Sequence, residues 1–248
     1  MLRMTYSKLS ECGPVRRINQ DSVLALTEDA AALFCIADGM GGYSEGEKAS
    51  SAMTEAVKKY WDDNKELFLG KYMAIVSDGL EKVISDVNKE LFEYGRKNDV
   101  CGTTVSILCL LGSNFFVLSV GDSRIYLRKK KDFSQITIDE IWSNMWIRDM
   151  ITGKTIPDPK YGQLLNAVGT DGKITVMKSC GTLTEKMMFL LCSDGLYKYC
   201  TEKEIKKALK YKKKPITDKR IEELKKAVAI NGEKDNLSIV IIKIDGII

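Results

Sequence analysis

Residues 33–42 read LFCIADGMGG, an apolar run that ends in an aspartate and a group of glycines. The apolar part has the length and composition of a buried strand. Two further apolar runs, 115–120 and 187–192, also lead into an aspartate beside a glycine, and a fourth, 237–242, begins just after an aspartate. Because antiparallel neighbours place the end of one strand beside the start of the next, four carboxylates are predicted to meet at one rim of the sheets. They are those of Asp38, Asp122, Asp194 and Asp235.

These four aspartates have two interpretations. An Asp-Gly pair at the end of a strand is in the first place a turn signal, and any one of the four can be explained in that way. Their recurrence at strand ends, together with the glycines of residues 39–42, favours a shared site. Crowded carboxylates repel one another, and they either take up protons or bind cations. Oxygen ligands suit Mg²⁺, Mn²⁺ or Ca²⁺, and Gly39 lets its carbonyl approach a metal without a side-chain clash.

The order of the remaining elements indicates an α+β fold. Apolar residues recur at helical spacing from Ser44 to Trp61 and from Met73 to Phe92, with no strand between the two helices. Such a pair is predicted to pack antiparallel over a sheet. Strand clusters separated by paired helices predict a sandwich with sheets inside and helices outside. The expected strands are 22–27, 32–37, 104–111, 115–120, 125–128, 135–138, 173–178, 187–192 and 237–244, and the expected later helices are 202–211 and 218–230.

The bulk composition is that of one soluble globular domain. The 248 residues are 44% hydrophobic and 29% charged, and four prolines with no low-complexity stretch give no sign of a linker. A net charge of +4 is too small to indicate nucleic acid or a membrane surface as the partner. No apolar run has the length of a membrane span, and no signal peptide is recognisable. A single domain over residues 1–248 is therefore expected, with a helix and surface excursion at about 139–165.

The counts of histidine and cysteine restrict the chemistry. The sequence contains no histidine, which excludes Ser-His-Asp and Cys-His catalysis and imidazole metal sites. Seven cysteines form no Cys-x-x-Cys pair, and most stand in apolar runs. Reduced thiols in a core fit this pattern, so a cytoplasmic protein is expected. Catalysis is left to carboxylates, lysine, arginine, thiols or a metal held by oxygen ligands.

Taken in order, the motifs resemble those of the metal-dependent protein phosphatases, the type 2C serine/threonine family. The resemblance runs from about Gly13 to Ile242, and the methionine after Asp38-Gly39 looks like the bacterial branch. One such motif is weak evidence, whereas six in the family's order are specific. The motifs are VRRINQD at 15–21, ADGMGG at 37–42, GTT at 102–104, GDSR at 121–124, SDGL at 193–196 and DN at 235–236.

The resemblance implies a fold and a metal centre. The fold is a four-layer α-β-β-α arrangement, in which helix pairs flank an antiparallel β-sandwich. Two Mn²⁺ or Mg²⁺ ions would share Asp38, and a water between them would become a nucleophile near neutral pH. The carbonyl of Gly39 would bind the second ion, and Asp194 and Asp235 would complete the shell of the first. Asp122, together with Asp194, matches a third and weaker cation site.

Two further roles follow from the same resemblance. Asp21 would hold metal-bound water in the outer shell. Arg16 would bind the substrate phosphate through its guanidinium fork. The implied reaction is in-line attack of the metal-activated water on the phosphorus of phosphoserine or phosphothreonine in proteins, with charge on the phosphoryl oxygens met by the metals and Arg16.

The sequence departs from the family pattern at three places. Gln20 stands where many members have glutamate, which predicts altered metal affinity rather than inactivity. Asn166 stands where bacterial relatives usually have arginine. Residues 139–141, DEI, replace a bacterial Asp-His-Ser pattern. The last two changes lie in or beside the segment that forms the substrate-contacting flap of the family, so this chain departs most from the family pattern at the flap. Arg124 is expected to support the Asp122 loop rather than to bind substrate.

Three other functions were weighed against this one. A cysteine-dependent tyrosine phosphatase needs Cys-x₅-Arg, which no cysteine provides. A P-loop needs lysine after its second glycine, where Glu47 stands instead. A degenerate member that binds phosphoproteins without hydrolysing them would have lost a metal ligand, whereas all four aspartates are present. The expected protein is a cytoplasmic, monomeric phosphatase whose partners are phosphorylated proteins, with a Ser/Thr kinase making the marks that it removes.

Overall fold

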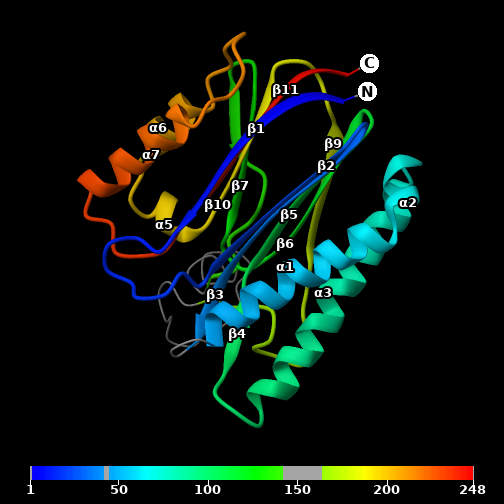
Figure 1. The fold of residues 1–248 in the computed structure, drawn as a ribbon, viewed down its shortest axis with the longest axis vertical. Coiled ribbons are helices and arrows are strands. Elements are labelled where there is room, and N and C mark those ends of the chain that lie inside the picture. Colours follow the sequence, from blue (N-terminus) through cyan, green and yellow to red (C-terminus); the bar gives the residue numbers. More distant parts are fainter. Residues whose placement is uncertain (1, 42–44, 142–163, 248) are drawn as a thin grey trace, which may run out of the picture.

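The computed structural model describes residues 2–41, 45–141 and 164–247. Figure 1 shows the described elements, which are mostly strands in the middle and helices outside. The strands are β1 Leu2–Glu11, β2 Asp21–Glu28, β3 Ala31–Gly41, β4 Cys101–Thr103, β5 Val105–Leu111, β6 Asn114–Val120, β7 Arg124–Lys129, β8 Asp132–Gln135, β9 Met177–Thr182, β10 Met187–Cys192 and β11 Leu237–Ile247. The helices are α1 Glu45–Asp63, α2 Lys65–Leu69, α3 Met73–Gly95, α5 Asp194–Tyr197, α6 Glu202–Ala208 and α7 Lys219–Ile230.

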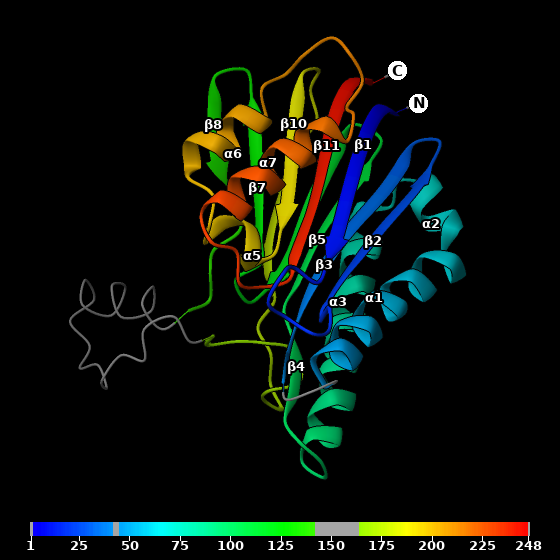
Figure 2. The same ribbon diagram turned by 60° about the vertical axis from the view of Figure 1, so that its left-hand side comes forward.

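The described strands form two antiparallel sheets. One has the order β1-β11-β10-β7-β8 and the other the order β2-β3-β5-β6-β9, with β4 paired to the end of β3. In the first sheet, β1 pairs with β11 along its whole length, from Leu2 opposite Ile247 to Glu11 opposite Leu237. The two described ends of the chain therefore lie side by side, at the end of the sandwich where N and C are marked in Figures 1 and 2.

Strand β3 shows why the sheets stack. Residues 31–37 are all fully buried, and successive side chains of a strand point to opposite faces. Ala32, Phe34 and Ile36 contribute to the core between the two sheets. Leu33 and Cys35 contribute instead to the core beneath α1 and α3. An apolar run without alternation is thus the mark of a strand covered on both faces.

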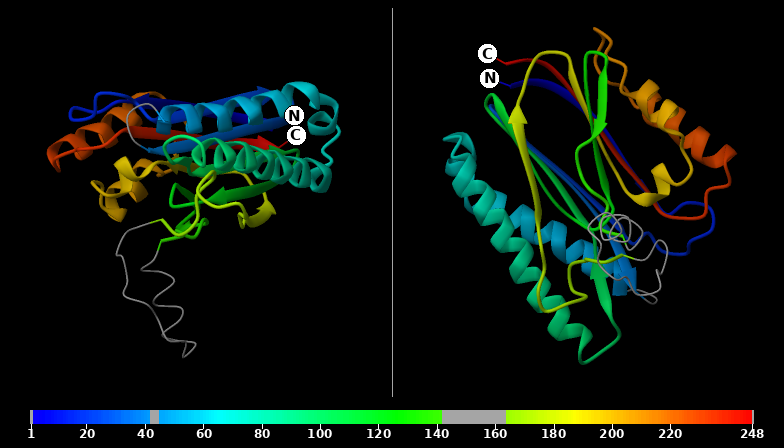
Figure 3. Two further views of the ribbon diagram at one scale, coloured as in Figure 1. Left: turned by 90° about the horizontal axis from the view of Figure 1, so that it is seen from below. Right: turned by 180° about the vertical axis from the view of Figure 1, so that it is seen from behind.

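Helices cover both outer faces of the sandwich. The amphipathic helices α1 and α3 pack on the sheet that contains β3, whereas α5, α6 and α7 pack on the sheet that contains β10 and β11. Figures 2 and 3 show the two helix groups on opposite sides of the strands. The expected α+β sandwich with four layers, α-β-β-α, is confirmed. The described helices include none long and apolar enough to cross a membrane.

Three local features show how the sequence sets the structure. Residues 112 and 113 make the tight turn between β5 and β6, with Leu111 paired to Asn114 and Gly112 at φ 59°. Helix α6 begins at Thr201 with a capping box to Glu204. None of the seven cysteines is in a disulfide, and five of them are buried, although Cys180 is exposed.

The expected boundaries were wrong in several places, and helix α6, expected at 202–211, ends at Ala208. Strand β9 was expected at 173–178 but spans Met177–Thr182, because its register is set by pairing with β6. Ile174 and Val176 still pack on the core beneath α3, so their alternation reports burial and not strand pairing. Strand β8 begins three residues earlier than expected, directly after a turn at Lys130.

Strand β1 was not expected at all; its full-length pairing with β11 makes it a strand despite a polar sequence. The expected excursion at 139–165 falls largely on residues 142–163, outside the described residues.

Candidate functional site

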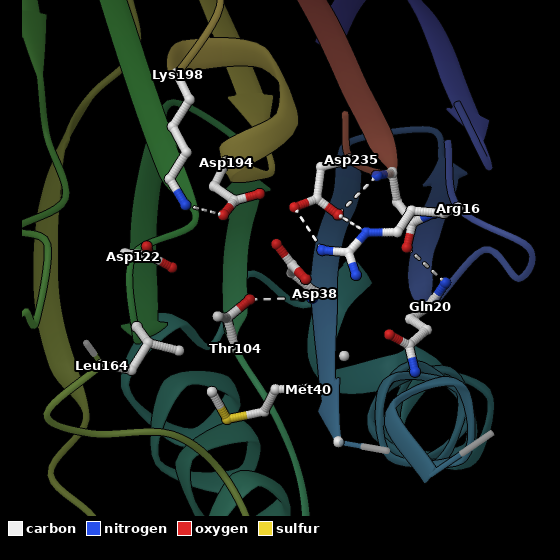
Figure 4. A pocket seen from close by; sticks show the side chains of 13 residues that line it. Arg16, Gln20, Asp38, Met40, Thr104, Asp122, Leu164, Asp194, Lys198 and Asp235 are labelled. Atoms are coloured by element: carbon white, nitrogen blue, oxygen red, sulfur yellow. Dashed lines mark hydrogen bonds and ion pairs between the residues drawn. The ribbon is translucent and has the colours of Figure 1, made fainter. Parts of the chain in front are cut away.

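A pocket of about 500 Å³ lies at the end of the sandwich away from the described chain ends, where β3 and β10 finish and β11 starts (Figure 4). All four aspartates predicted to converge line this pocket. Asp38 comes from β3, Asp122 follows β6, Asp194 opens α5, and Asp235 precedes β11. The predicted convergence is confirmed. The lining residues are Arg16, Gln20, Asp38, Gly39, Met40, Gly41, Thr104, Asp122, Leu164, Asp194, Lys198, Asp235 and Asn236.

Asp38 is fixed by its backbone at the floor of the pocket. Its N–H donates to Thr104 Oγ1 (3.0 Å), and its carbonyl accepts from Thr104 N (2.9 Å) and Thr103 Oγ1 (3.0 Å). Burial raises the pKa of Asp38 well above its ordinary value, and the charges of Asp21, Asp194, Asp122 and Asp235 raise it further. Ionised Asp38 is therefore unfavourable beside the neighbouring carboxylates, and a cation bound next to it would relieve this repulsion.

Asp21 lies behind Asp38 rather than in the pocket lining. The two residues are paired across β2 and β3, and Asp21 is buried at 8% exposure. Its Oδ2 accepts from Ser193 Oγ at 2.8 Å, while its Oδ1 is buried and has no hydrogen-bond partner among the described residues. Burial raises the pKa of Asp21 to about 6, against the hydrogen bonds from Ser238 and Ser193, which lower it. A buried acceptor oxygen beside Asp38 has the chemistry of a group that receives a water or a proton.

Two cationic side chains neutralise the other carboxylates. Arg16 binds Asp235 through both ends of its guanidinium, Nε to Oδ1 at 2.9 Å and Nη2 to Oδ2 at 3.0 Å. The Lys198 ammonium lies 2.5 Å from Asp194 Oδ2. Within the described ranges, no three acidic or thiol side chains form a ready-made metal cage. Arg16 is thus seen as a partner of Asp235, and its expected contact with phosphate stays a prediction.

Gly39 is required by the close approach of three chain segments. Its N–H donates to the carbonyl of Gln20 at 3.0 Å. A Cβ at this position would lie 2.0 Å from the carbonyl oxygen of Gly46 and 2.6 Å from that of Gln20. No real Cβ is tolerated at such distances, so only glycine lets the first turn of α1 lie against the end of β3. The glycine places its own backbone in the pocket lining beside Asp38.

The Asp122 side of the pocket is supported from outside. The Tyr197 hydroxyl donates to Asp122 Oδ2 at 2.8 Å. The Arg124 guanidinium stacks over the Tyr197 ring at 3.5 Å and pairs with Asp139 at 2.6 Å. Burial is the main reason that the pKa of Asp122 is raised. Arg124 supports this loop as expected, whereas the part of Tyr197 could not be read from its position in a short helix.

Asn236 connects the Arg16 loop to the start of β11. It accepts the Gln20 N–H at 2.9 Å, and its amide donates to the carbonyls of Cys12 (2.8 Å) and Ile18 (3.0 Å). The residue is 5% exposed, so these groups have little access to water. Asn236 thus does more than cap one turn, because three backbone groups of residues 12–20 bond to its side chain.

Asn236→Ala is therefore expected to lower the free energy of unfolding by about 1–3 kcal/mol, since two carbonyls and one N–H of residues 12–20 lose their bonds to a buried side chain. Urea denaturation of the variant and the wild type measures the change. Asn231→Ala is the matched control: Asn231 is exposed, and its side-chain amide donates to the Tyr199 carbonyl, a bond that the substitution removes while the backbone bonds of Asn231 stay. Equal losses in the two variants would contradict the anchoring role.

Glu140 and Asn166, which stand on either side of residues 142–163 in the sequence, lie beside the pocket wall and bond to each other. Glu140 Oε2 accepts the N–H of Gly121 at 2.9 Å. The Asn166 amide donates to the same oxygen at 3.0 Å and to the carbonyl of Thr175 at 2.7 Å. Asn166, which stands where arginine was expected, thus donates a hydrogen bond from its neutral amide to the Glu140 carboxylate. This contact lies next to the turn that carries Asp122.

The donor set fits a divalent cation. It consists of carboxylate oxygens and a backbone carbonyl, without histidine or a lining cysteine, which matches Mg²⁺ or Mn²⁺ better than zinc. The raised pKa of Asp38 and the unpartnered Oδ1 of Asp21 are both relieved by positive charge or a bound water. The four aspartates and Gly39 are therefore candidates for holding the metal; their ligand roles stay predictions.

Comparisons with known proteins agree with this geometry. A sequence profile described as protein phosphatase 2C matches residues 15–231. The serine/threonine phosphatase stp of Listeria monocytogenes serotype 4b is 28% identical over 94% of this chain and 93% of its own length. The serine/threonine protein phosphatase PstP of Mycobacterium tuberculosis is 28% identical over 97% of this chain and 45% of its own.

Solved structures share the fold. The serine/threonine phosphatase of S. agalactiae superposes with a TM-score of 0.84 at 24% identity, over 98% of this chain and all of that chain. The match of the family profile to most of the sequence, from the Arg16 motif to the end of α7, shows the relationship directly. The chain belongs to the protein phosphatase 2C family and is a protein serine/threonine phosphatase.

Proposed function

We propose that this phosphatase is metal-dependent and hydrolyses phosphoserine and phosphothreonine in proteins at the Asp38 pocket. The carrying observation is that four aspartates from distant segments line one pocket, where burial and the charges of neighbouring carboxylates raise the pKa of Asp38. Asp38, the Gly39 carbonyl, Asp194 and Asp235 would hold two Mn²⁺ or Mg²⁺ ions. Such a pair, when bound, makes water nucleophilic near neutral pH and neutralises phosphoryl oxygens.

The protein's own groups position the reaction. Thr103 and Thr104 hold Asp38 through its backbone, so its carboxylate has a fixed direction. Asp21, behind it, has a buried carboxylate oxygen available to orient water. Gln20 and Asn236 fasten the loop that carries Arg16 at the rim of the pocket. With no histidine in the sequence, water within the pocket is left to protonate the departing serine or threonine oxygen.

Arg16 would bind the substrate phosphate. Its side chain is half exposed, and its guanidinium fork already binds the two oxygens of a carboxylate, a geometry that phosphate shares. If Asp235 were bound to a cation, the guanidinium fork of Arg16 would no longer be needed to neutralise it and could bind the phosphate.

Arg16→Ala is expected to raise KM for a phosphopeptide by roughly tenfold or more with a smaller change in kcat, because it removes a charge-assisted contact to the ground-state phosphate. Steady-state kinetics measure both constants. Arg17→Ala is the matched control, because Arg17 is exposed and does not line the pocket. An unchanged KM for Arg16→Ala would show that another cation binds the phosphate.

The metal requirement can be tested directly. Hydrolysis of p-nitrophenyl phosphate is expected with Mn²⁺, is expected to disappear with EDTA, and should return with excess Mn²⁺. A panel of phosphoserine, phosphothreonine and phosphotyrosine peptides under Mn²⁺ and Mg²⁺ then defines the substrate class. Full activity in EDTA would contradict the proposal. Binding of phosphopeptides without turnover under any metal would instead favour the degenerate phosphoprotein-binding function.

The cellular setting is part of the same proposal. The protein would act as a single-domain monomer in the cytoplasm, on proteins phosphorylated by a Ser/Thr kinase. Seven cysteines without a disulfide support a reducing compartment. The contiguous cores of the two sheets and their helices support one domain.

A further inference from the structure

Lys198 is a cation inside the pocket for which the proposed reaction has no role. It follows α5 at its C-cap, four residues after Asp194, so one helical turn brings its side chain back over that aspartate. The ammonium lies 2.5 Å from Asp194 Oδ2, and no hydrogen bond to Asp194 Oδ1 is found in the described part of the chain. Figure 4 shows the ammonium pointing into the pocket on the side of Asp122.

The charges around Lys198 are those of the candidate metal ligands. After Asp194, the carboxylates of Asp122 and Asp235 act most strongly on the ammonium. Conversely, Lys198 is the cation that partly offsets the charge of Asp122. One ammonium therefore serves the two carboxylates, Asp122 and Asp194, that the family resemblance assigns to a third divalent cation.

The Asp122 carboxylate is also partly committed. The Tyr197 hydroxyl donates to its Oδ2, and Tyr197 is held in place by the Arg124 guanidinium. A third cation at this position would have one oxygen of Asp122 and one of Asp194 left to it, and it would face an ammonium. The positive charges of this cation and of the Lys198 ammonium would repel each other. The lysine is part of the chain and is therefore present at every metal concentration.

We propose that the Lys198 ammonium takes the place of a third divalent cation between Asp122 and Asp194, so that this chain binds two divalent ions and not three. The inference rests on the proposed metal-dependent function. This would distinguish the phosphatase from any relative that requires a third ion. The Lys198 ammonium carries one positive charge and three N–H donors and is covalently attached, whereas a divalent ion carries two charges and can exchange.

The test counts Mn²⁺ ions bound by the full chain, using the electron paramagnetic resonance signal of free Mn²⁺ during titration. The wild type is expected to saturate at two ions. Lys198→Met, which keeps much of the side-chain length and removes the charge, is expected to bind a third ion at least about tenfold more tightly than the wild type. Lys198→Arg, which keeps the charge, should remain at two.

Two further variants make the count specific. Asp122→Asn combined with Lys198→Met is expected to return to two ions, because the third ion loses its second carboxylate. Lys203→Met removes an exposed lysine of α6 that does not line the pocket, and it should match the wild type. Thermal unfolding without metal checks that each variant is folded; Lys198 is half exposed, so the single variants should be.

The outcomes separate this inference from the function beneath it. Three ions in the wild type, or two in Lys198→Met, would overturn the role of Lys198 while leaving a metal-dependent phosphatase. No Mn²⁺ bound by the wild type would overturn the proposed metal centre itself. A third ion in Lys198→Met that survives Asp122→Asn would place the ion elsewhere, and would also refute the proposal.

Discussion

Asp38→Asn is expected to lower kcat for phosphopeptide hydrolysis by at least about a hundredfold. Loss of a residue that only supports a metal ligand costs roughly ten- to a hundredfold, and Asp38 is proposed to be a ligand shared by both ions. The variant keeps the backbone bonds to Thr103 and Thr104, so the fold should persist. Steady-state kinetics at saturating Mn²⁺ measure the loss.

Thermal unfolding gives an independent view of the same variant. Because the folded-state pKa of Asp38 is raised, its ionised form at neutral pH opposes folding, and this cost is absent only below its ordinary pKa. The metal-free variant should therefore unfold at the same or a higher temperature than the metal-free wild type. The stabilisation that Mn²⁺ gives by binding the folded state should be largely lost.

Asp63→Asn is the matched control for Asp38→Asn. Asp63 lies at the end of α1 and is 56% exposed in a surface pair with Lys59, far from the pocket lining. It should have wild-type kinetics and wild-type stabilisation by Mn²⁺. Normal turnover by Asp38→Asn would remove Asp38 from the centre of the reaction.

Gly39→Ala is expected to abolish most activity and to lower the free energy of unfolding by roughly 2–4 kcal/mol, a severe effect for a single methyl group. The added Cβ would lie 2.0 Å from a carbonyl oxygen, so either β3 or the start of α1 must move. Movement of β3 displaces Asp38, and movement of the helix opens the core on which it packs. Urea denaturation and p-nitrophenyl phosphate hydrolysis measure the two effects.

Gly95→Ala is the matched control for Gly39→Ala. A Cβ at Gly95, the last residue of α3, would have its nearest neighbour at 3.6 Å, which is ordinary contact. Alanine is also the better helix former, so this variant should be as stable as the wild type or slightly more so. If Gly39→Ala behaved like Gly95→Ala, the close packing at Gly39 would not be needed.

The four pocket aspartates could be predicted from sequence because each stands at the boundary of a run of apolar residues. A strand that is buried on both faces is recognisable in the sequence as an unbroken apolar run. An aspartate that ends such a strand must lie at the edge of the sheet. Residues 33–38 contain this information locally, so the fold class and the pocket were predicted together.

The positions of Asp21 and Lys198 could not be predicted in the same way. Asp21 faces Asp38 only through the register of β2 against β3, and its hydrogen bond comes from Ser193, which lies between β10 and α5. Lys198 is four residues from Asp194, a spacing typical of a helical ion pair, but α5 is only four residues long. A helix that short leaves no periodic pattern in the sequence.

Arg16 shows a different limit. The motif identified a residue at the pocket, but its partner in the structure, Asp235, lies near the opposite end of the sequence. Such a pair depends on β1 and β11 being neighbours, and the polar sequence of β1 gave no sign that it was a strand. Long-range pairing decides the contact, and local pattern cannot show it.

The neighbouring first and last strands have a consequence for synthesis on the ribosome. Strand β1 is synthesised long before β11, and until β11 follows, β1 and β10 each have an unpaired edge. Asp235 is delivered with the same late strand. A nascent chain can thus form the β3 side of the pocket but not the whole pocket, so under the proposed function an unfinished polypeptide would not hydrolyse phosphoproteins.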